Sequence, residues 1–145
     1  MNISIKYTNI QSSPSIEKYT HKKIGALAKF VDSIEKNDPD FRDPIQVWVE
    51  IGKPNRHHQK GKIFYAECQI NLPGVTIRKE SMQYDLRVAI DDVKNKMERL
   101  LKRYKEKQSA KIKRGAREAK RRGKIAKGAK LRELGKGSRN LYEGN

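Results

Sequence analysis

The strongest hydrophobic pattern in the chain lies between Asp85 and Lys107. Its apolar residues recur at steps of four and three, which places all of them on one stripe of an α-helix. They are Leu86, Ile90, Val93, Met97, Leu100, Leu101 and Tyr104. A helix of this kind buries one side against its own protein, so the rest of the chain is expected to build the surface on which it packs.

Basic residues occupy both margins of this predicted helix, at about 100° of rotation per residue. They are Lys96, Arg99 and Arg103 on one flank, Arg87, Lys94 and Lys105 on the other, and Lys102 near the outer pole. The pattern predicts a rigid helix whose cationic edges face an anionic partner.

Four segments alternate apolar and polar residues and are predicted as strands with one buried face. They cover residues 3–8, 45–52, 63–72 and 75–80, and Pro73-Gly74 between the last two is a hairpin signal. A further helix is predicted from Pro14, with Ser13 as its N-cap, to about residues 30–33 or one turn further. The expected fold is α+β in the order β-α-β-β-β-α, with two helices packed on one face of a four-stranded sheet.

The periodic pattern stops after Lys107, where glycines and cations outnumber the few large aliphatic residues. Such a segment cannot bury enough apolar surface to offset the entropy of ordering it. The sequence therefore predicts a folded domain over residues 1–107 and a flexible basic tail over residues 108–145. The tail is expected to order on a polyanion, for example as short helical pieces.

The charge is unevenly distributed along the chain. The total of 34 Lys and Arg against 17 Asp and Glu gives +17. Residues 1–101 hold 17 basic and 13 acidic groups, a net charge of +4, whereas residues 102–145 hold 17 basic and 4 acidic groups, a net charge of +13. This distribution is typical of a polyanion binder, with nucleic acid as the first candidate and an anionic membrane as the second.

Several other classes are disfavoured by the sequence. A single cysteine, Cys68, excludes an intrachain disulfide framework and a cysteine-rich zinc site, and its alternation with Ala66 and Ile70 predicts a buried position. No apolar run approaches the roughly 20 residues that span a bilayer, and the N-terminus lacks the apolar region of a signal peptide. A soluble cytoplasmic protein is expected.

Catalysis and metal binding have little support in the sequence. The adjacent His57 and His58 lie in a predicted loop without an acidic cluster, so they make poor metal ligands or general bases. Trp48 and Tyr65 fall on the sheet face opposite the helices. They could stack on a base, although cross-strand packing is favoured. No enzyme, cofactor, metal or small-molecule substrate is therefore predicted.

Parts of the chain resemble the ribosome hibernation-promoting factor family, also called ribosome-associated inhibitor A or ribosomal subunit interface protein. The resemblance lies in the runs at residues 64–81, 85–91 and 96–105. The last helix of the family opens with an Asp-Met-Tyr-Ala-Ala-Ile-Asp-like run and continues with Lys-Leu-Glu-Arg-Gln-Leu. The matching residues here are Asp85, Ala89, Ile90, Asp91, Lys96, Glu98, Arg99 and Leu101. Arg87 stands where the family usually has Tyr.

The resemblance implies a non-catalytic protein that binds the small ribosomal subunit, where mRNA and tRNA would sit, and holds ribosomes idle. Small-subunit rRNA and the whole ribosome are the implied partners, and the protein is expected to be monomeric off the ribosome. Long forms of the family carry a further β-rich domain that pairs ribosomes, which the tail here does not resemble. A general basic RNA-binding protein without ribosome specificity is the alternative.

The candidate rRNA contacts combine the family match with the charge pattern. The strongest are the cations of the last helix, and those of the first helix would form an adjoining edge. The full set is Lys22, Lys23, Lys29, Arg56, Lys60, Arg87, Lys94, Lys96, Arg99, Lys102, Arg103, Lys105, Arg114, Arg117, Arg121 and Arg122.

Overall fold

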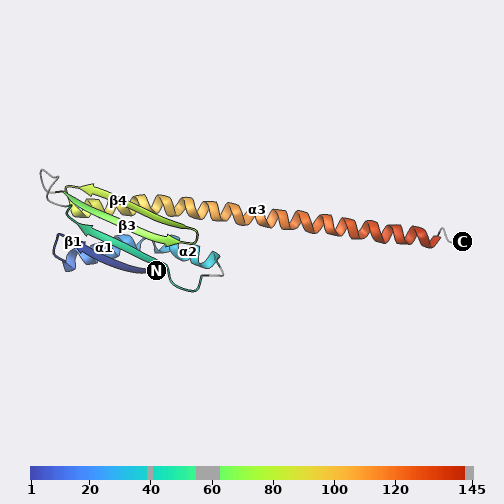
Figure 1. The fold of residues 1–145 in the computed structure, drawn as a ribbon, viewed down its shortest axis with the longest axis horizontal. Coiled ribbons are helices and arrows are strands. Elements are labelled where there is room, and N and C mark those ends of the chain that lie inside the picture. Colours follow the sequence, from blue (N-terminus) through green and yellow to red (C-terminus); the bar gives the residue numbers. More distant parts are fainter. Residues whose placement is uncertain (39–40, 55–62, 143–145) are drawn as a thin grey trace. The chain divides into compact units, whose positions relative to one another are not determined.

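The computed structural model describes the backbone of residues 1–38, 41–54 and 63–142, and the side chains in those ranges as far as Arg132. Its elements are β1 (Asn2–Thr8), α1 (Pro14–Gly25), α2 (Ala28–Asn37), β2 (Gln46–Gly52), β3 (Phe64–Leu72), β4 (Val75–Gln83) and α3 (Leu86–Tyr142), which Figure 1 labels. The chain divides into two compact units, Met1–Lys105 and Glu106–Asn145.

The first unit contains one mixed sheet in the order β1-β2-β3-β4. β1 pairs with β2 in parallel, with Ile5 opposite Val49, and the crossover between them contains α1 and α2. The β2-β3 and β3-β4 pairs are antiparallel, which confirms the predicted meander. The β3-β4 turn is tight because Gly74 takes a φ of +77°, a conformation that side chains with a Cβ disfavour.

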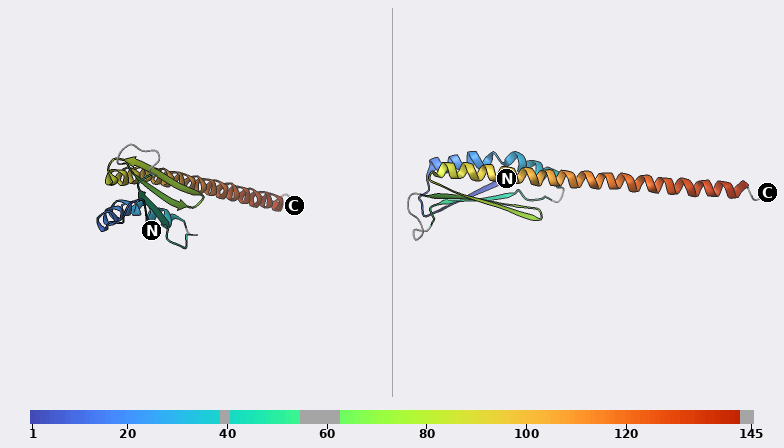
Figure 2. Two further views of the ribbon diagram at one scale, coloured as in Figure 1. Left: turned by 60° about the vertical axis from the view of Figure 1, so that its left-hand side comes forward. Right: turned by 90° about the horizontal axis from the view of Figure 1, so that it is seen from above.

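The core lies between the sheet and the helices, because α1, α2 and the first turns of α3 all cover the same sheet face (Figure 2). The alternating strand residues and the helical stripes meet there as predicted. Its largest fully buried members are Ile24, Leu27, Val31, Ile34, Val47, Val49, Ile51, Ile70, Ile90, Val93, Met97 and Leu101. Full burial of each such side chain contributes about 1.5–3 kcal/mol. Cys68 is also buried, and this burial raises the pKa of its thiol to about 12.

The helix predicted after the first strand is two helices rather than one. α1 begins at Pro14 after Ser13, as predicted, but it ends at Gly25. The backbone N–H groups of Ala26 and Leu27 then bond to carbonyl oxygens three residues back, and α2 starts at Ala28. Glycine is a weak helix former, which accounts for the break at this point. The buried stripe continues across it, so the packing surface is the one that was expected.

The prediction that the last helix ends near Lys107 is wrong, because α3 continues to Tyr142. The sequence argument detected a buried stripe, and a helix does not need one. Lysine, arginine, alanine and glutamate are all good helix formers, and they dominate residues 106–132. Ile112, Ile125 and Leu131 are 54%, 63% and 69% exposed. The expected lack of apolar burial in this segment is therefore confirmed for the side chains that the structure describes, while its flexibility stays a prediction.

Candidate nucleic-acid interface

The candidate site lies within the first unit, where α3 runs beside the edge strand β4. The two elements are joined only by Tyr84 and Asp85, so the helix turns back along the strand that precedes it. Asp85 caps the helix start. Its Oδ1 accepts a hydrogen bond from the Arg87 backbone N–H at 2.8 Å, and its carbonyl oxygen accepts one from Ala89 at 3.0 Å.

Three hydrogen bonds connect β4 and its hairpin to α3. Next to the connecting turn, the Ser81 hydroxyl donates to Asp92 at 2.5 Å. Further along, the Lys96 ammonium donates to the Glu80 carbonyl oxygen at 3.1 Å. At the β3-β4 turn, the Tyr104 hydroxyl donates to the carbonyl oxygen of Pro73 at 3.1 Å. The distance between strand and helix is therefore fixed at both ends of the pair.

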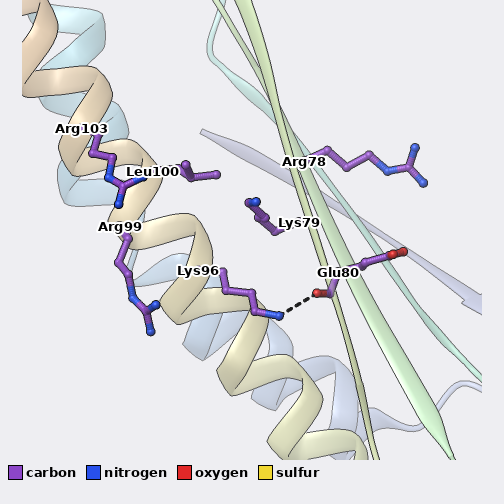
Figure 3. A pocket seen from close by; sticks show the side chains of 7 residues that line it. All are labelled: Arg78, Lys79, Glu80, Lys96, Arg99, Leu100 and Arg103. Atoms are coloured by element: carbon purple, nitrogen blue, oxygen red, sulfur yellow. Dashed lines mark hydrogen bonds between the residues drawn. The ribbon is translucent and has the colours of Figure 1, made fainter.

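A groove of about 760 Å³ opens between these contacts. It is lined by Arg78, Lys79 and Glu80 of β4 and by Lys96, Arg99, Leu100 and Arg103 of α3 (Figure 3). The side chains of Arg78 and Glu80 lie on the side of the strand away from the helix, whereas Lys79 lies between strand and helix. The groove thus has cations on both walls, and its one lining carboxylate points elsewhere.

The cations of the groove differ in how they are bound within the protein. Lys96 lies 3.2 Å from an oxygen of Asp92 in addition to its bond to Glu80. The Ser81 hydroxyl, followed by Lys96, lowers the pKa of Asp92, so this carboxylate stays ionised beside Lys96. Arg78 is paired with Glu67 at 2.7 Å. Within the described part of the chain, no carboxylate lies within 4.0 Å of the cationic groups of Lys79, Arg99 or Arg103, so these three are available to an anionic ligand.

On the opposite flank of α3, two of the positive charges are neutralised by a carboxylate of the same helix. Lys94 donates to Glu98 at 2.6 Å, and Lys102 lies 3.4 Å from the other oxygen of the same carboxylate. The hydrogen bond from Lys94 is the largest cause of the lowered pKa of Glu98. These contacts place Lys94 and Lys102 in intrahelical pairs, which makes them weaker candidates for phosphate contact than Arg99 and Arg103.

Lys23 and Arg87 join α1 to α3. Lys23 lies 3.6 Å from Asp91, which also accepts a 2.7 Å hydrogen bond from the hydroxyl of Tyr19. The Arg87 guanidinium donates to the Ser15 hydroxyl at 3.0 Å and lies 5.3 Å from the centre of the Tyr19 ring. Both cations therefore have a structural role that sequence reasoning did not foresee.

The remaining predicted residues lie outside the groove. Lys22 on α1 and Lys29 on α2 are exposed, and Lys105 is half-buried near the end of the first unit. In the second unit, Arg114, Arg117, Arg121 and Arg122 are exposed on α3. Arg56 and Lys60 lie outside the described residues.

Sequence reasoning missed Lys79, which the structure places in the groove. The available signal was strand alternation, because Lys79 shares the helix-facing side of β4 with Ile77 and Ser81, which are 8% and 4% exposed. A lysine at an inward-facing position of an edge strand commonly discourages pairing with another strand. Here it also adds a cation to the strand side of the groove that Arg99 and Arg103 line from α3.

The outer face of the sheet does not continue this cationic surface. Glu50 accepts hydrogen bonds from the Thr8 and Tyr65 hydroxyls, both at 2.7 Å, and these lower its pKa. Tyr65 is thereby held by a cross-strand contact, as the sequence favoured. Trp48, between Ser4 and Gln69 in the sheet register, is 42% exposed.

The described residues contain neither a metal-binding cluster nor a helix that could span a membrane. No group of three His, Cys, Asp or Glu side chains there could hold a metal ion. None of the helices, as far as the structure describes them, has a stretch apolar enough to cross a membrane. His57 and His58 lie outside the described residues.

Comparison with known proteins identifies the class to which this arrangement belongs. The family model described as "Sigma 54 modulation protein / S30EA ribosomal protein" matches residues 3–109. The chain therefore belongs to that family, and the resemblance to hibernation-promoting factors seen in the sequence is confirmed.

Individual relatives agree with this assignment. The chain is 26% identical over 112 residues to the ribosome hibernation promotion factor of Bacillus subtilis (strain 168), a match that covers 77% of this chain and 52% of that protein. The chain thus spans about half the length of this curated relative.

Two solved structures share the fold. The N-terminal domain of Thermus thermophilus Protein Y superimposes with a TM-score of 0.55 at 27% identity, over 72% of this chain and 99% of that one. A ribosomal subunit interface protein from Coxiella burnetii gives a TM-score of 0.54 over 72% and 98% of the two chains. At 22% identity, the second similarity concerns the fold alone.

Proposed function

We propose that this protein is a ribosome hibernation factor that binds rRNA of the small subunit in the mRNA and tRNA channel and silences translation by occupying it. The observation that carries the proposal is family membership over residues 3–109. The name of the Bacillus subtilis relative, ribosome hibernation promotion factor, supports the same function. That relative is about twice as long as the matched part, so pairing of ribosomes is not included in the proposal.

The surface chemistry supports a polyanionic partner. Lys79, Arg99 and Arg103 have no carboxylate partner among the described residues, and they lie on a rigid helix–strand pair. Contacts of this type bind phosphates with little sequence readout and with a strong dependence on salt. Folded RNA is in any case recognised mainly by shape and backbone. A binder that fills a space between rRNA helices would need a rigid cationic edge of this kind.

The second unit would add affinity along the rRNA. Its described side chains include the exposed Arg114, Arg117, Arg121 and Arg122, with few acidic residues among them. We propose that this segment contacts phosphates without reading sequence. The protein would act in the cytoplasm, as a monomer off the ribosome, without catalysis, a cofactor or a small-molecule substrate.

The test is co-sedimentation of the full chain with purified small and large ribosomal subunits at near-physiological salt. The proposal predicts retention on the small subunit and its loss when tRNA and mRNA occupy the channel. An in vitro translation reaction should be inhibited over the same range of protein concentration.

The rival function, a general RNA-binding protein, is favoured by one specific observation, the concentration of cations after residue 101. That function predicts equal retention on both subunits, indifferent to tRNA and mRNA. Such a result would remove the channel from the proposal and leave a basic RNA-binding protein.

A further inference from the structure

We propose that the groove between β4 and α3 binds the sugar-phosphate backbone of an unpaired RNA strand, with Lys79, Arg99 and Arg103 as phosphate ligands. This inference rests on the proposed function, because it specifies which form of rRNA the folded unit takes into its groove. It goes beyond that function in two ways. It assigns a phosphate contact to Lys79 on the edge strand, and it predicts that the groove binds single-stranded RNA in preference to duplex.

Cations line the groove from both the strand and the helix. Lys79 extends from β4 into the space beside α3, whereas Arg99 and Arg103 line the groove from α3 and extend along the helix rather than toward Lys79 (Figure 3). The two arginines are four residues apart, about 6 Å along the helix axis. A strand lying along the groove would meet Lys79 beside β4 and the two arginines along the helix edge, at two points along its length. This arrangement suits a chain of phosphates better than a single anion.

The lining also excludes other ligand classes. Small-molecule sites of about 300–1,000 Å³ are mostly apolar, whereas Leu100 is the one aliphatic side chain among the residues that line this groove. The Glu80 carboxylate faces away from the helix, and its carbonyl oxygen is already bonded to Lys96. The surface offered to a ligand is therefore cationic, with a short apolar floor.

The size of the groove favours one strand over two. Its volume of about 760 Å³ has room for a short stretch of a single strand. A groove of this volume cannot take in both strands of a double helix, so a duplex would present the phosphates of one strand only and could not follow the groove to Lys79. The groove therefore discriminates by shape and leaves the base edges unread, as phosphate contacts generally do.

The groove is also preformed, which lowers the entropic cost of binding. The Lys96–Glu80 hydrogen bond spans one end, and the hydroxyl of Tyr104 bonds to Pro73 toward the other. Packing of the buried stripe beneath, from Ile90 to Leu101, holds the helix wall in place. A ligand needs only to order the side chains of Lys79, Arg99 and Arg103.

The experiment compares two labelled RNAs by fluorescence anisotropy with the full chain at several salt concentrations. One is a 12-nucleotide oligouridylate and the other is a 12-base-pair duplex. The variant Lys79→Gln/Arg103→Gln should lose about tenfold in affinity for the oligouridylate, with a salt slope lower by about 1.4, because two single-strand phosphate contacts are removed. Its affinity for the duplex should fall less than about threefold.

A matched control removes the same amount of charge elsewhere. Lys18→Gln/Lys36→Gln changes two exposed cations of α1 and α2 that lie outside the groove and are not among the candidate rRNA contacts. It should affect the two RNAs to a similar, small extent. Equal losses for single strand and duplex in the groove variant, or losses no larger than in the control, would overturn the inference.

Two further measurements use the parent protein, so they do not depend on whether the variants fold. They distinguish binding in the groove from binding elsewhere and from attraction to any polyanion. Amide and arginine side-chain NMR shifts should change along residues 76–80 and at Arg99 and Arg103 when oligouridylate is added. Shift changes confined to residues 106–142 would contradict the groove. Displacement of the oligouridylate by poly-glutamate at equal charge would show a general polyanion site instead.

The outcome is separable from that of the proposed function. If the parent protein co-sediments with the small subunit but its groove does not bind oligouridylate, the groove assignment fails and the ribosomal function remains. If the groove binds oligouridylate but the protein is not retained on the small subunit, the ribosomal function fails and the groove remains.

Discussion

The ammonium group of Lys96 donates a hydrogen bond to the backbone carbonyl oxygen of Glu80 across 3.1 Å, and so joins α3 to the outer edge of the sheet. An edge strand exposes unpaired carbonyl groups that can template further pairing, and this lysine covers one of them. Because it also contacts Asp92 at 3.2 Å, Lys96 stabilises the fold as well as adding charge to the groove.

Replacing Lys96 with methionine should therefore destabilise the protein. The variant keeps most of the aliphatic length but removes both polar contacts, for an expected loss of about 1 kcal/mol in the free energy of unfolding. Urea denaturation followed by the fluorescence of Trp48, the single tryptophan, measures this change. Lys22→Met, at an exposed position on α1, is the control and should stay within about 0.5 kcal/mol of the parent. Equal stabilities for the two variants would deny Lys96 this structural role.

Asp92 should contribute to the pH dependence of stability. The Ser81 hydroxyl and Lys96 lower its pKa in the folded protein below the ordinary value of 3.8. A group with a lowered folded pKa stabilises the protein above its unfolded pKa, and this contribution is lost as the pH falls through the folded pKa. Asp92→Asn should therefore lower stability at pH 6 and lose less than the parent as the pH falls below 3.8 toward the lowered folded pKa.

Denaturation curves at several pH values test this expectation for Asp92. Asp32→Asn, at an exposed position on α2, should leave the pH profile of the parent unchanged. A profile for Asp92→Asn that runs parallel to that of the parent would show that this carboxylate is not linked to acid unfolding.

Most of the first unit could be predicted from hydrophobic periodicity, because each element there buries one face. The alternation of Val47, Val49 and Ile51 places them in the core, as it predicted. The break between α1 and α2 escaped the same reasoning, since Ile24 and Leu27 on its two sides both remain buried. Periodicity detects a continuous packing surface, and it does not detect a one-turn change in hydrogen bonding.

The candidate site was harder to predict, because it depends on which residues meet across elements. The family match and the charge pattern selected Arg99 and Arg103, which the structure leaves without a carboxylate partner among the described residues. They also selected Lys94, which is paired with Glu98. Strand alternation puts Lys79 on the helix-facing side of β4, but only the edge position of β4 in the sheet shows that Lys79 lies beside α3 rather than in the core. The sequence shows whether a surface carries positive or negative charge, whereas the ion pairs that its side chains form depend on the fold.

The glycines of the second unit should limit its helicity. A Cβ added at Gly115, Gly123 or Gly128 would meet nothing within 4 Å, so no contact in the structure requires glycine there. Each costs about 1 kcal/mol of helix stability relative to alanine. Changing all three to alanine should raise the helical circular dichroism signal and make it melt at higher temperature. If that segment orders on RNA, the variant should also bind oligouridylate more tightly.

The matched control for this prediction makes the reverse change on the same segment. Ala116→Gly, Ala119→Gly and Ala126→Gly alter exposed positions of α3 without changing charge. They should lower both the helical signal and the affinity. A glycine-to-alanine variant that gains helicity but not affinity would show that the helical form of this segment is not the form that binds RNA.

Arginines of the second unit should set the salt dependence of ribosome binding. Replacing Arg114, Arg117, Arg121 and Arg122 with glutamine removes four exposed charges and keeps good helix formers in place. If each contacts a phosphate, the slope of log affinity against log salt should fall by up to about 3. Binding to the small subunit, measured by co-sedimentation from low to moderate salt, should then weaken most at low salt. A slope equal to that of the parent would mean that this segment makes no phosphate contacts, and would leave the first unit as the whole rRNA interface.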